Sequence, residues 1–149
     1  MARSVFFSFH FDRDSWRVGQ VRNSNVIKEF PKSTYVRDKA AWETVKRKGD
    51  PAIQAWIDQQ LRGTSMTVVL IGNQTANRRW VKYEIRKSIE LGHGLLGIDI
   101  SKIKNVMGQT DETGVNPLPS GYKRYAWNND KGAENLARWI EQAARDAGL

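Results

Sequence analysis

Short apolar runs alternate along this chain with segments whose apolar residues recur every three or four positions. The clearest run, residues 67–71, is rich in β-branched side chains and is too short for a helix that faces solvent. Such a run is typical of a strand that is covered on both faces of a sheet. By this pattern we predict strands at residues 3–9, 33–36, 67–71, 95–100 and 122–127.

Helical periodicity fills the intervals between these strands. The predicted helices run from residue 12 or 14 to 23, from 38 to 48, from 50 to 63, from 75 or 77 to 91, and onward from 129 or 130. Because strands that alternate with helices are typical of parallel sheets, we predict an α/β fold. Within this class we predict a flavodoxin-like, doubly wound parallel five-stranded sheet in the order 2-1-3-4-5, with the strands of residues 3–9 and 67–71 adjacent at the centre.

Residues that favour helix ends stand at several of these boundaries. Asp50 followed by Pro51 predicts a helix start, because Asp accepts bonds from free N–H groups and Pro loses no bond in the first turn. Gly63 would supply the left-handed residue that ends this helix. Thr75 or Asn77 would cap the next helix through a side-chain oxygen.

The size and composition of the chain predict a single domain, residues 1–149. Of its 149 residues, 40% are hydrophobic, which is enough for a sizeable core. No apolar stretch approaches the ~20 residues that a membrane helix needs, and we identify no secretion signal. The absence of cysteine excludes disulfides and thiol nucleophiles, and it fits a cytoplasmic location.

A formal net charge of +8 favours anionic partners, and nucleic acid is the first of these to consider. The basic residues are scattered, however, and their densest clusters lack the interleaved aromatic residues of a base-stacking surface. We therefore favour solvated basic faces, with contacts to dinucleotide phosphates as the next choice and nucleic acid as an unlikely partner. The clusters are Lys46-Arg47-Lys48, Arg78-Arg79 with Lys82, and Lys102 with Lys104.

The helix that ends near residue 91 carries a carboxylate of interest. At about 100° per residue, one stripe of this helix faces the sheet, whereas Glu84 falls on the border of that stripe, beside Trp80. We therefore expect the Glu84 carboxylate at the rim of the core, although an ordinary surface glutamate is the alternative. The stripe contains Val81, Ile85, Ser88 and Ile89.

The end of the first predicted strand is a candidate ligand site, because open α/β sheets bind ligands beyond the C-terminal ends of their strands. His10 could act there as a general base or have only a structural role. His93 stands between two glycines and is interpreted as a turn residue. The expected pocket-lining residues are Ser8, Phe9, His10 and Phe11.

Residues 102–121 are polar, contain two glycines and two prolines before Gly121, and lack an apolar period. We predict a long loop here. Since it follows the C-terminal end of a strand, it could cover the ligand pocket.

Several chemistries lack their motifs. The chain has no Gly-x-Gly-x-x-Gly segment after a strand, no P-loop, no Gly-x-Ser-x-Gly elbow, and no His or Cys at metal-ligand spacing. These absences argue against a dehydrogenase, an NTPase and a zinc enzyme. An isolated carboxylate beside an aromatic wall, at the ligand-binding edge of an α/β sheet, suits cleavage of a glycosidic bond.

Three segments together resemble the TIR family: Val5-Phe6-Phe7-Ser8-Phe9, the block from Val69 to Glu90, and Gly97-Ile98-Asp99-Ile100. The match is closer still to the TIR-like, flavodoxin-fold proteins of bacterial Thoeris anti-phage defence, and it spans most of the chain. In TIR domains a Trp and a Glu four residues later mark the NAD-cleaving site. Trp80 and Glu84 have this spacing here.

The resemblance implies an enzyme that cleaves the nicotinamide–ribose bond of NAD, with Glu84 as the catalytic residue. NAD would be the substrate, with no metal and no other cofactor. The product implied is a cyclic ADP-ribose isomer, an anti-phage signal for a separate effector, and self-association is an option. The substrate-binding residues implied are Phe6, Phe7, Ser8, Phe9, His10, Trp42, Arg79 and Trp80.

Two alternatives stay open. Trp42 could fill the core instead of forming a pocket wall. The whole chain could also be a non-catalytic, TIR-like protein-interaction scaffold.

Overall fold

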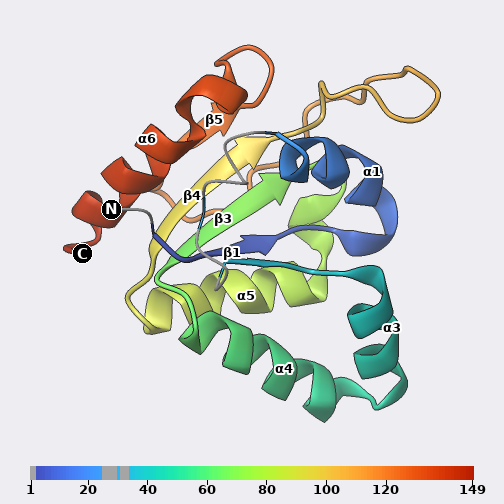
Figure 1. Cartoon of the computed structure of the whole chain (residues 1–149), viewed down its shortest axis with the longest axis vertical. Coiled ribbons are helices and arrows are strands. Elements are labelled where there is room, and N and C mark those ends of the chain that lie inside the picture. The colour runs from blue at the N-terminus through green and yellow to red at the C-terminus, as the bar shows by residue number, and fades with distance from the viewer. Residues whose placement is uncertain (1–2, 25–29, 31–33) are drawn as a thin grey trace.

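The computed structural model describes residues 3–24, 30 and 34–149. In these residues a five-stranded sheet carries helices on both faces (Figure 1). The strands lie in the order β2-β1-β3-β4-β5, and every neighbouring pair is parallel. The predicted α/β class and parallel sheet are confirmed. The strands are β1 (Val5–Ser8), β2 (Tyr35–Val36), β3 (Met66–Ile71), β4 (Gly94–Asp99) and β5 (Arg124–Ala126).

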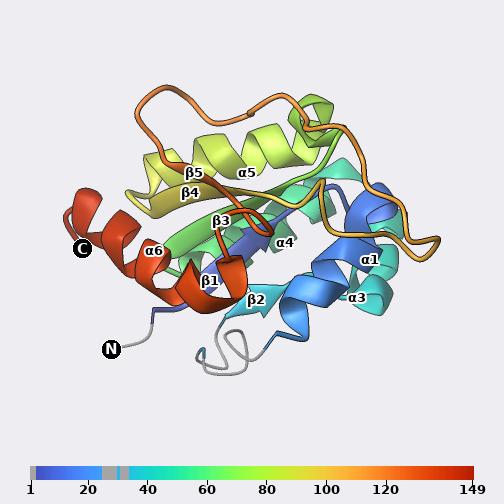
Figure 2. The ribbon, with the colours of Figure 1, turned by 90° about the horizontal axis from the view of Figure 1, so that it is seen from above.

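The helices that follow β1 and β3 lie on opposite faces of the sheet. α1 and α6 cover one face, whereas α3, α4 and α5 cover the other (Figure 2). Because the helices that follow β1 and β3 lie on opposite faces, the C-terminal ends of these strands border a ligand-binding position. The helices are α1 (Phe11–Arg22), α3 (Lys39–Arg47), α4 (Asp50–Arg62), α5 (Arg79–Glu90) and α6 (Gly132–Asp146), with a 3₁₀ turn η1 (Thr75–Asn77).

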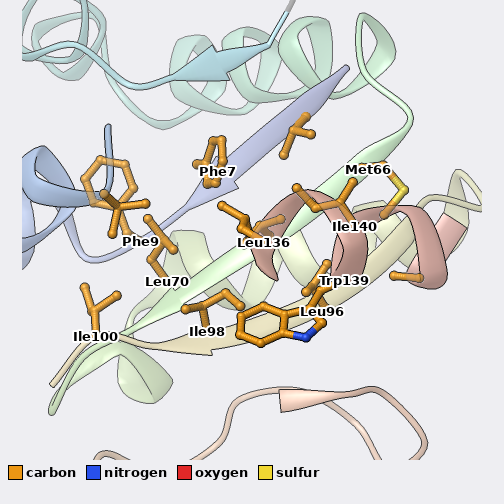
Figure 3. Close-up of a cluster of buried hydrophobic side chains, with 14 of the residues drawn as sticks. Phe7, Phe9, Met66, Leu70, Leu96, Ile98, Ile100, Leu136, Trp139 and Ile140 are labelled. Carbon is orange, nitrogen blue, oxygen red and sulfur yellow. The ribbon is translucent and has the colours of Figure 1, made fainter. Parts of the chain in front are cut away.

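The core lies on both faces of the central strands. Successive strand residues point to opposite faces, so Phe7 packs toward α1 and α6, while Phe6 packs toward α4. Figure 3 shows Phe7 with Leu136 and Trp139 of α6 in the larger cluster. Both faces are covered, which explains why the strand sequences are continuous apolar runs.

Two predicted helix ends agree with the structure only in part. Asp38 caps α3 by accepting a bond from the Ala40 amide at 2.8 Å, as the predicted helix start requires. Gly63, however, has φ −81°, so the prediction of a left-handed residue there is wrong. The end of α4 is closed by a right-handed turn whose N–H reaches preceding carbonyls.

The other cap predictions are wrong: Gly49 precedes α4 in place of Asp50, and Arg78 precedes α5 in place of Thr75 or Asn77. Thr75 does not cap α5. Its hydroxyl accepts a hydrogen bond from the Gly72 N–H at 2.7 Å and donates one to Asp14 Oδ2 at 3.3 Å. Asp14 lies inside the first turn of α1 and is buried, and His10 occupies the N-cap position. Lys131, with φ 57°, precedes α6 in place of Asn129 or Asp130. Ser33, in the predicted second strand, lies outside the described residues.

The predicted loop of residues 102–121 contains no helix or strand, and its first part lies against α1 (Figure 1). The buried Arg17 side chain of α1 donates to the Ile103 carbonyl at 2.6 Å, the Gln109 carbonyl at 3.1 Å and the Asp111 carboxylate at 2.7 Å. Arg13 binds the same carboxylate at 2.9 Å. These contacts hold the loop beside α1.

Replacing Arg17 with Met is expected to release this loop. The change leaves two carbonyls and a carboxylate without their donor, so we expect the free energy of unfolding to fall by about 2–4 kcal/mol. Urea denaturation and faster hydrogen exchange of amides in residues 102–111 would detect it. Arg13→Met is the control, because it removes only the more exposed partner of Asp111 and should cost less than about 1 kcal/mol. Equal effects of the two changes would contradict this account.

Candidate active site

Three side chains from different elements meet beneath the C-terminal ends of β1 and β2. Ser8 ends β1, Arg37 directly follows β2, and Glu84 lies in the second turn of α5. The parallel register pairs Phe7 with Val36, which brings the next residues, Ser8 and Arg37, side by side. Ser8 Oγ donates to Glu84 Oε1 at 2.7 Å, and Arg37 donates to Glu84 Oε2 in an ion pair. Both carboxylate oxygens are therefore bound.

The Glu84 side chain is fully buried, with 0% of its surface exposed, so the predicted position at the rim of the core is wrong. α5 packs against α4 as well as the sheet, and this second contact widens its buried arc toward Glu84. Ile89 was predicted to lie in the buried stripe of this helix, but its side chain is 41% exposed because the buried face is shifted toward Glu84. A buried carboxylate is tolerated here because Arg37 supplies the opposite charge.

Aromatic rings enclose the Arg37 guanidinium. Its carbon atom lies 4.5 Å from the ring centroid of Trp42, 5.6 Å from that of Phe9 and 5.8 Å from that of Trp56. Contacts of this kind contribute about 0.5–2 kcal/mol each. Arg37 is only 4% exposed, and its Nε has no hydrogen-bond partner among the described residues. The enclosed guanidinium separates Glu84 from solvent.

Two opposing effects act on the ionisation of Glu84. Burial raises the pKa of its carboxyl group, whereas the charge of Arg37 and the hydrogen bond from Ser8 lower it. The ionised form of Glu84 therefore depends on Arg37.

A cavity of about 210 Å³ opens beside this ion pair. Arg37 lines it, and so does Arg78, which precedes α5. A second cavity, of about 480 Å³, shares Arg37, Phe9 and Phe11 as walls. Five predicted substrate-binding residues line the smaller cavity: Phe9, His10, Trp42, Arg79 and Trp80.

Comparison with known proteins supports the resemblance seen in the sequence. The family model of the TIR-like domain of the Thoeris protein ThsB matches residues 6–105, which is more than half of the chain. The chain belongs to the ThsB TIR-like family. A relative, the putative cyclic ADP-D-ribose synthase ThsB1 of Bacillus cereus (strain MSX-D12), is 43% identical over 140 residues, covering 93% of this chain and 72% of that protein. The segment that matches the ThsB family model contains Ser8, Arg37 and Glu84.

Three other predicted substrate residues do not line the cavity of this ThsB-family protein. Phe7 lies on the opposite face of the sheet, because the strand pleat turns it away from Glu84. Phe6 is buried in the cluster beneath α4. Ser8 is buried too, but it reaches the site through its bond to Glu84. Phe6 and Phe7 thus lie away from the cavity, and the predicted pocket-lining position of Ser8 is wrong, because Ser8 supports the carboxylate from below.

The two arginines at the start of α5 differ in their partners. Arg79 forms an exposed ion pair with Asp50 at 2.6 Å, and its guanidinium carbon lies 4.6 Å from the Trp80 ring centroid. Arg78 has neither an ion pair nor a side-chain hydrogen bond with any residue that the structure describes. Arg78 is therefore the better placed of the two to bind an anion in the cavity.

Sequence reasoning missed Arg37. An arginine after a short edge strand reads as a surface residue, since charged side chains are rarely buried without a partner. The available signal was its position at the C-terminal end of a strand next to β1, the same sheet edge as Ser8. The contact between Arg37 and Glu84, which are 47 positions apart in the chain, is seen only in the folded structure.

A second buried carboxylate, Asp14, has a structural role. One of its oxygens faces Thr75, the other has no partner among the described residues, and burial raises the pKa of the group. A Cβ at Gly72 would lie 2.2 Å from this carboxylate, so only glycine fits there. Asp14 thus packs against the turn that leads into α5. The described residues contain no group of three or more His, Cys, Asp or Glu side chains that could hold a metal ion.

None of the helices in the described residues has the length and apolar character that crossing a membrane requires.

Proposed function

We propose that this chain is a TIR enzyme that cleaves the nicotinamide–ribose bond of NAD and forms a cyclic ADP-ribose isomer. The observation that carries the proposal is Glu84, a carboxylate held beside an aromatic cavity at the ligand-binding edge of a flavodoxin-like sheet of order 2-1-3-4-5. The 43% identical relative is named as a putative cyclic ADP-D-ribose synthase, which supports the same reaction.

Glu84 would act on the charge that develops as nicotinamide leaves. The carbon–nitrogen bond breaks, its electron pair departs with nicotinamide, and positive charge spreads over the ribose C1 and ring oxygen. At an effective dielectric near 20, a carboxylate about 4 Å away stabilises this charge by roughly 4 kcal/mol. If felt only in the transition state, that interaction raises the rate by about three decades.

Access to Glu84 requires Arg37 to move. Arg37 now binds the carboxylate and lines both cavities, so its displacement would expose Glu84 and join the two spaces along their shared wall. The substrate offers Arg37 another partner, because a guanidinium binds a diphosphate as well as a carboxylate. Arg78, with Arg79 and Lys82 nearby on α5, is a further candidate for the phosphates.

Aromatic walls favour a cyclic product over plain hydrolysis. Phe9, Trp42 and Trp80 line the cavity and limit the room for water. Where water is excluded, a nucleophile in the same substrate captures C1 at a high effective concentration.

The biological role follows from the Thoeris assignment of the family. We propose that a single TIR-like domain, residues 1–149, acts in the cytoplasm as an antiviral NAD hydrolase and cyclase. Its product would be sensed by a separate effector, and self-association of the chain would regulate it. NAD serves as the substrate, and no metal or cofactor is proposed.

A second candidate function is a non-catalytic TIR-like scaffold. The buried ion pair between Arg37 and Glu84 favours the scaffold, because the carboxylate is not accessible to a substrate in this conformation.

Nicotinamide release distinguishes the two functions. The pure protein would be incubated with NAD, alone and with extract of phage-infected cells, and nicotinamide quantified by chromatography. Release in the presence of extract, above the level given by extract alone, is the expected result. A folded protein that releases none in either condition would favour the scaffold.

A further inference from the structure

The two histidines of the chain are held in different ways. His93 lies at the N-terminal edge of the sheet, where its Nδ1 is 3.1 Å from Thr67 Oγ1. His10 lies at the C-terminal edge and is equally buried, at 8% exposure. Its imidazole has no hydrogen-bond partner among the described residues, and it lines the 210 Å³ cavity beside Arg37. The ring of His93 is thus part of the fold, whereas that of His10 is available to a ligand.

The backbone places His10 on the same side of the sheet as Glu84. His10 follows Ser8 by two residues, and Phe9 between them packs into the cluster under α1 and α6, on the opposite side, so the alternation of β1 continues to His10. Residues two apart in such a segment face the same way and lie about 6.6–6.8 Å apart. Because Ser8 binds Glu84, the imidazole stands one step farther along this side, in the cavity wall. Groups attached near a ribose held at Glu84 would therefore reach His10.

The surroundings keep this imidazole uncharged near neutral pH. Burial lowers the pKa of His10, and the charges of Arg78 and Arg13 lower it further, while Asp12 has the opposite effect. Arg37 and Arg79 line the same cavity and add positive charge. A neutral imidazole can accept a proton, which is the property a general base needs.

We propose that His10 is the general base of cyclisation and accepts the proton of an adenosine-ribose hydroxyl as that oxygen attacks C1. This inference rests on the proposed function. As nicotinamide leaves with the electron pair of the broken carbon–nitrogen bond, a lone pair of the hydroxyl oxygen forms the new bond to C1. The hydroxyl proton passes to the ring nitrogen of His10 and then to solvent. NAD⁺ thus gives cyclic ADP-ribose isomer, nicotinamide and one proton, with no oxidant or reductant.

A general base suits a hydroxyl nucleophile. A hydroxyl is a weak nucleophile until its proton is removed, whereas an adenine ring nitrogen already has a free lone pair. A base beside the reacting carbon is therefore useful only where a hydroxyl attacks.

The test compares His10→Gln with His93→Gln in activated protein, since glutamine cannot accept the proton and His93 is remote from the cavity. A general base contributes about 10²–10⁴-fold, so His10→Gln should lower cyclic-product formation by at least 100-fold. Nicotinamide release should fall less, because water still captures C1, and the ratio of cyclic to linear product should fall with it. His93→Gln should leave that ratio unchanged. Because burial lowers the pKa of His10, cyclic-product formation by wild type should decline only at pH values below the ordinary histidine pKa of about 6.5, and His10→Gln should abolish this decline.

Two results would overturn the role of His10. They are an unchanged product ratio in folded His10→Gln and a cyclic product joined through an adenine nitrogen. The second result uses wild-type protein, so it decides the question even where His10→Gln fails to fold. Each requires that NAD be consumed. Failure of the proposed function is recognised separately, because nicotinamide release is then absent from wild type.

Discussion

Glu84→Gln is expected to lower NAD turnover by about three decades and to destabilise the fold as well. Glutamine keeps the size of the side chain and its contact with Ser8 but removes the charge that stabilises the cationic ribose. It also leaves Arg37 as a buried, unpaired cation. Removing one partner of a buried ion pair costs about 3–5 kcal/mol in the free energy of unfolding.

Both effects can be measured against a matched control on the same helix. Glu90→Gln makes the same change at an exposed position, where Lys87 is the ion-pair partner at 3.5 Å. It should leave turnover unchanged and cost less than about 1 kcal/mol. Urea denaturation gives stability, and nicotinamide release gives turnover under conditions in which each variant is folded. If folded Glu84→Gln consumes NAD as fast as activated wild type, the site is elsewhere.

Arg37→Met is expected to destabilise the protein by a similar amount, about 3–5 kcal/mol, because it leaves Glu84 as a buried, unpaired anion. Methionine is uncharged and flexible enough to fill the aromatic enclosure. With both charges removed, no buried charge is left unpaired, so Glu84→Gln/Arg37→Met should cost less than either single change. The double variant should therefore regain stability without regaining turnover, which separates folding from chemistry.

The pH dependence of Arg37→Met gives an independent check. Burial without Arg37 raises the pKa of Glu84 further, and a raised carboxyl pKa gives stability that is lost as the pH rises through the folded-state pKa. The loss in free energy of unfolding relative to wild type should shrink as the pH falls toward the ordinary Glu pKa of about 4.3, because protonated Glu84 needs no cation beside it. If the loss in free energy of unfolding of Arg37→Met were constant from pH 7 to pH 4, Glu84 and Arg37 would not be coupled. The same conclusion would follow if the effects of Glu84→Gln and Arg37→Met on stability simply added. Arg79→Met, at an exposed pair with Asp50, should show neither effect.

The fold was largely predictable because its signals are local. The run at residues 67–71 is buried on both faces as β3, and the periodicity of residues 50–63 forms α4 with Ile53, Ile57 and Leu61 inward. Helix ends were less predictable. Thr75 and Asp14 both have the chemistry of caps, but they face each other across the β3–α5 turn.

The site was predictable only where one segment carries it. Trp80 and Glu84 follow from a single helical motif, and Phe9 and His10 follow from the end of one strand. Arg37 and the burial of Glu84 depend on the meeting of three elements, which no local pattern encodes. The alternation of β1 was visible in the sequence, but which of Phe6 and Phe7 would face α4 depended on how the helices pack.

Mass analysis of the nucleotide that activated protein forms from NAD tests the central claim most directly. Wild type is compared with the Glu84→Gln/Arg37→Met variant, which we expect to be folded. Wild type should yield a product one water lighter than ADP-ribose, together with nicotinamide, and the double variant should yield neither. Equal products from both proteins, or none from wild type in any activating extract, would contradict the assignment of Glu84 to NAD cleavage.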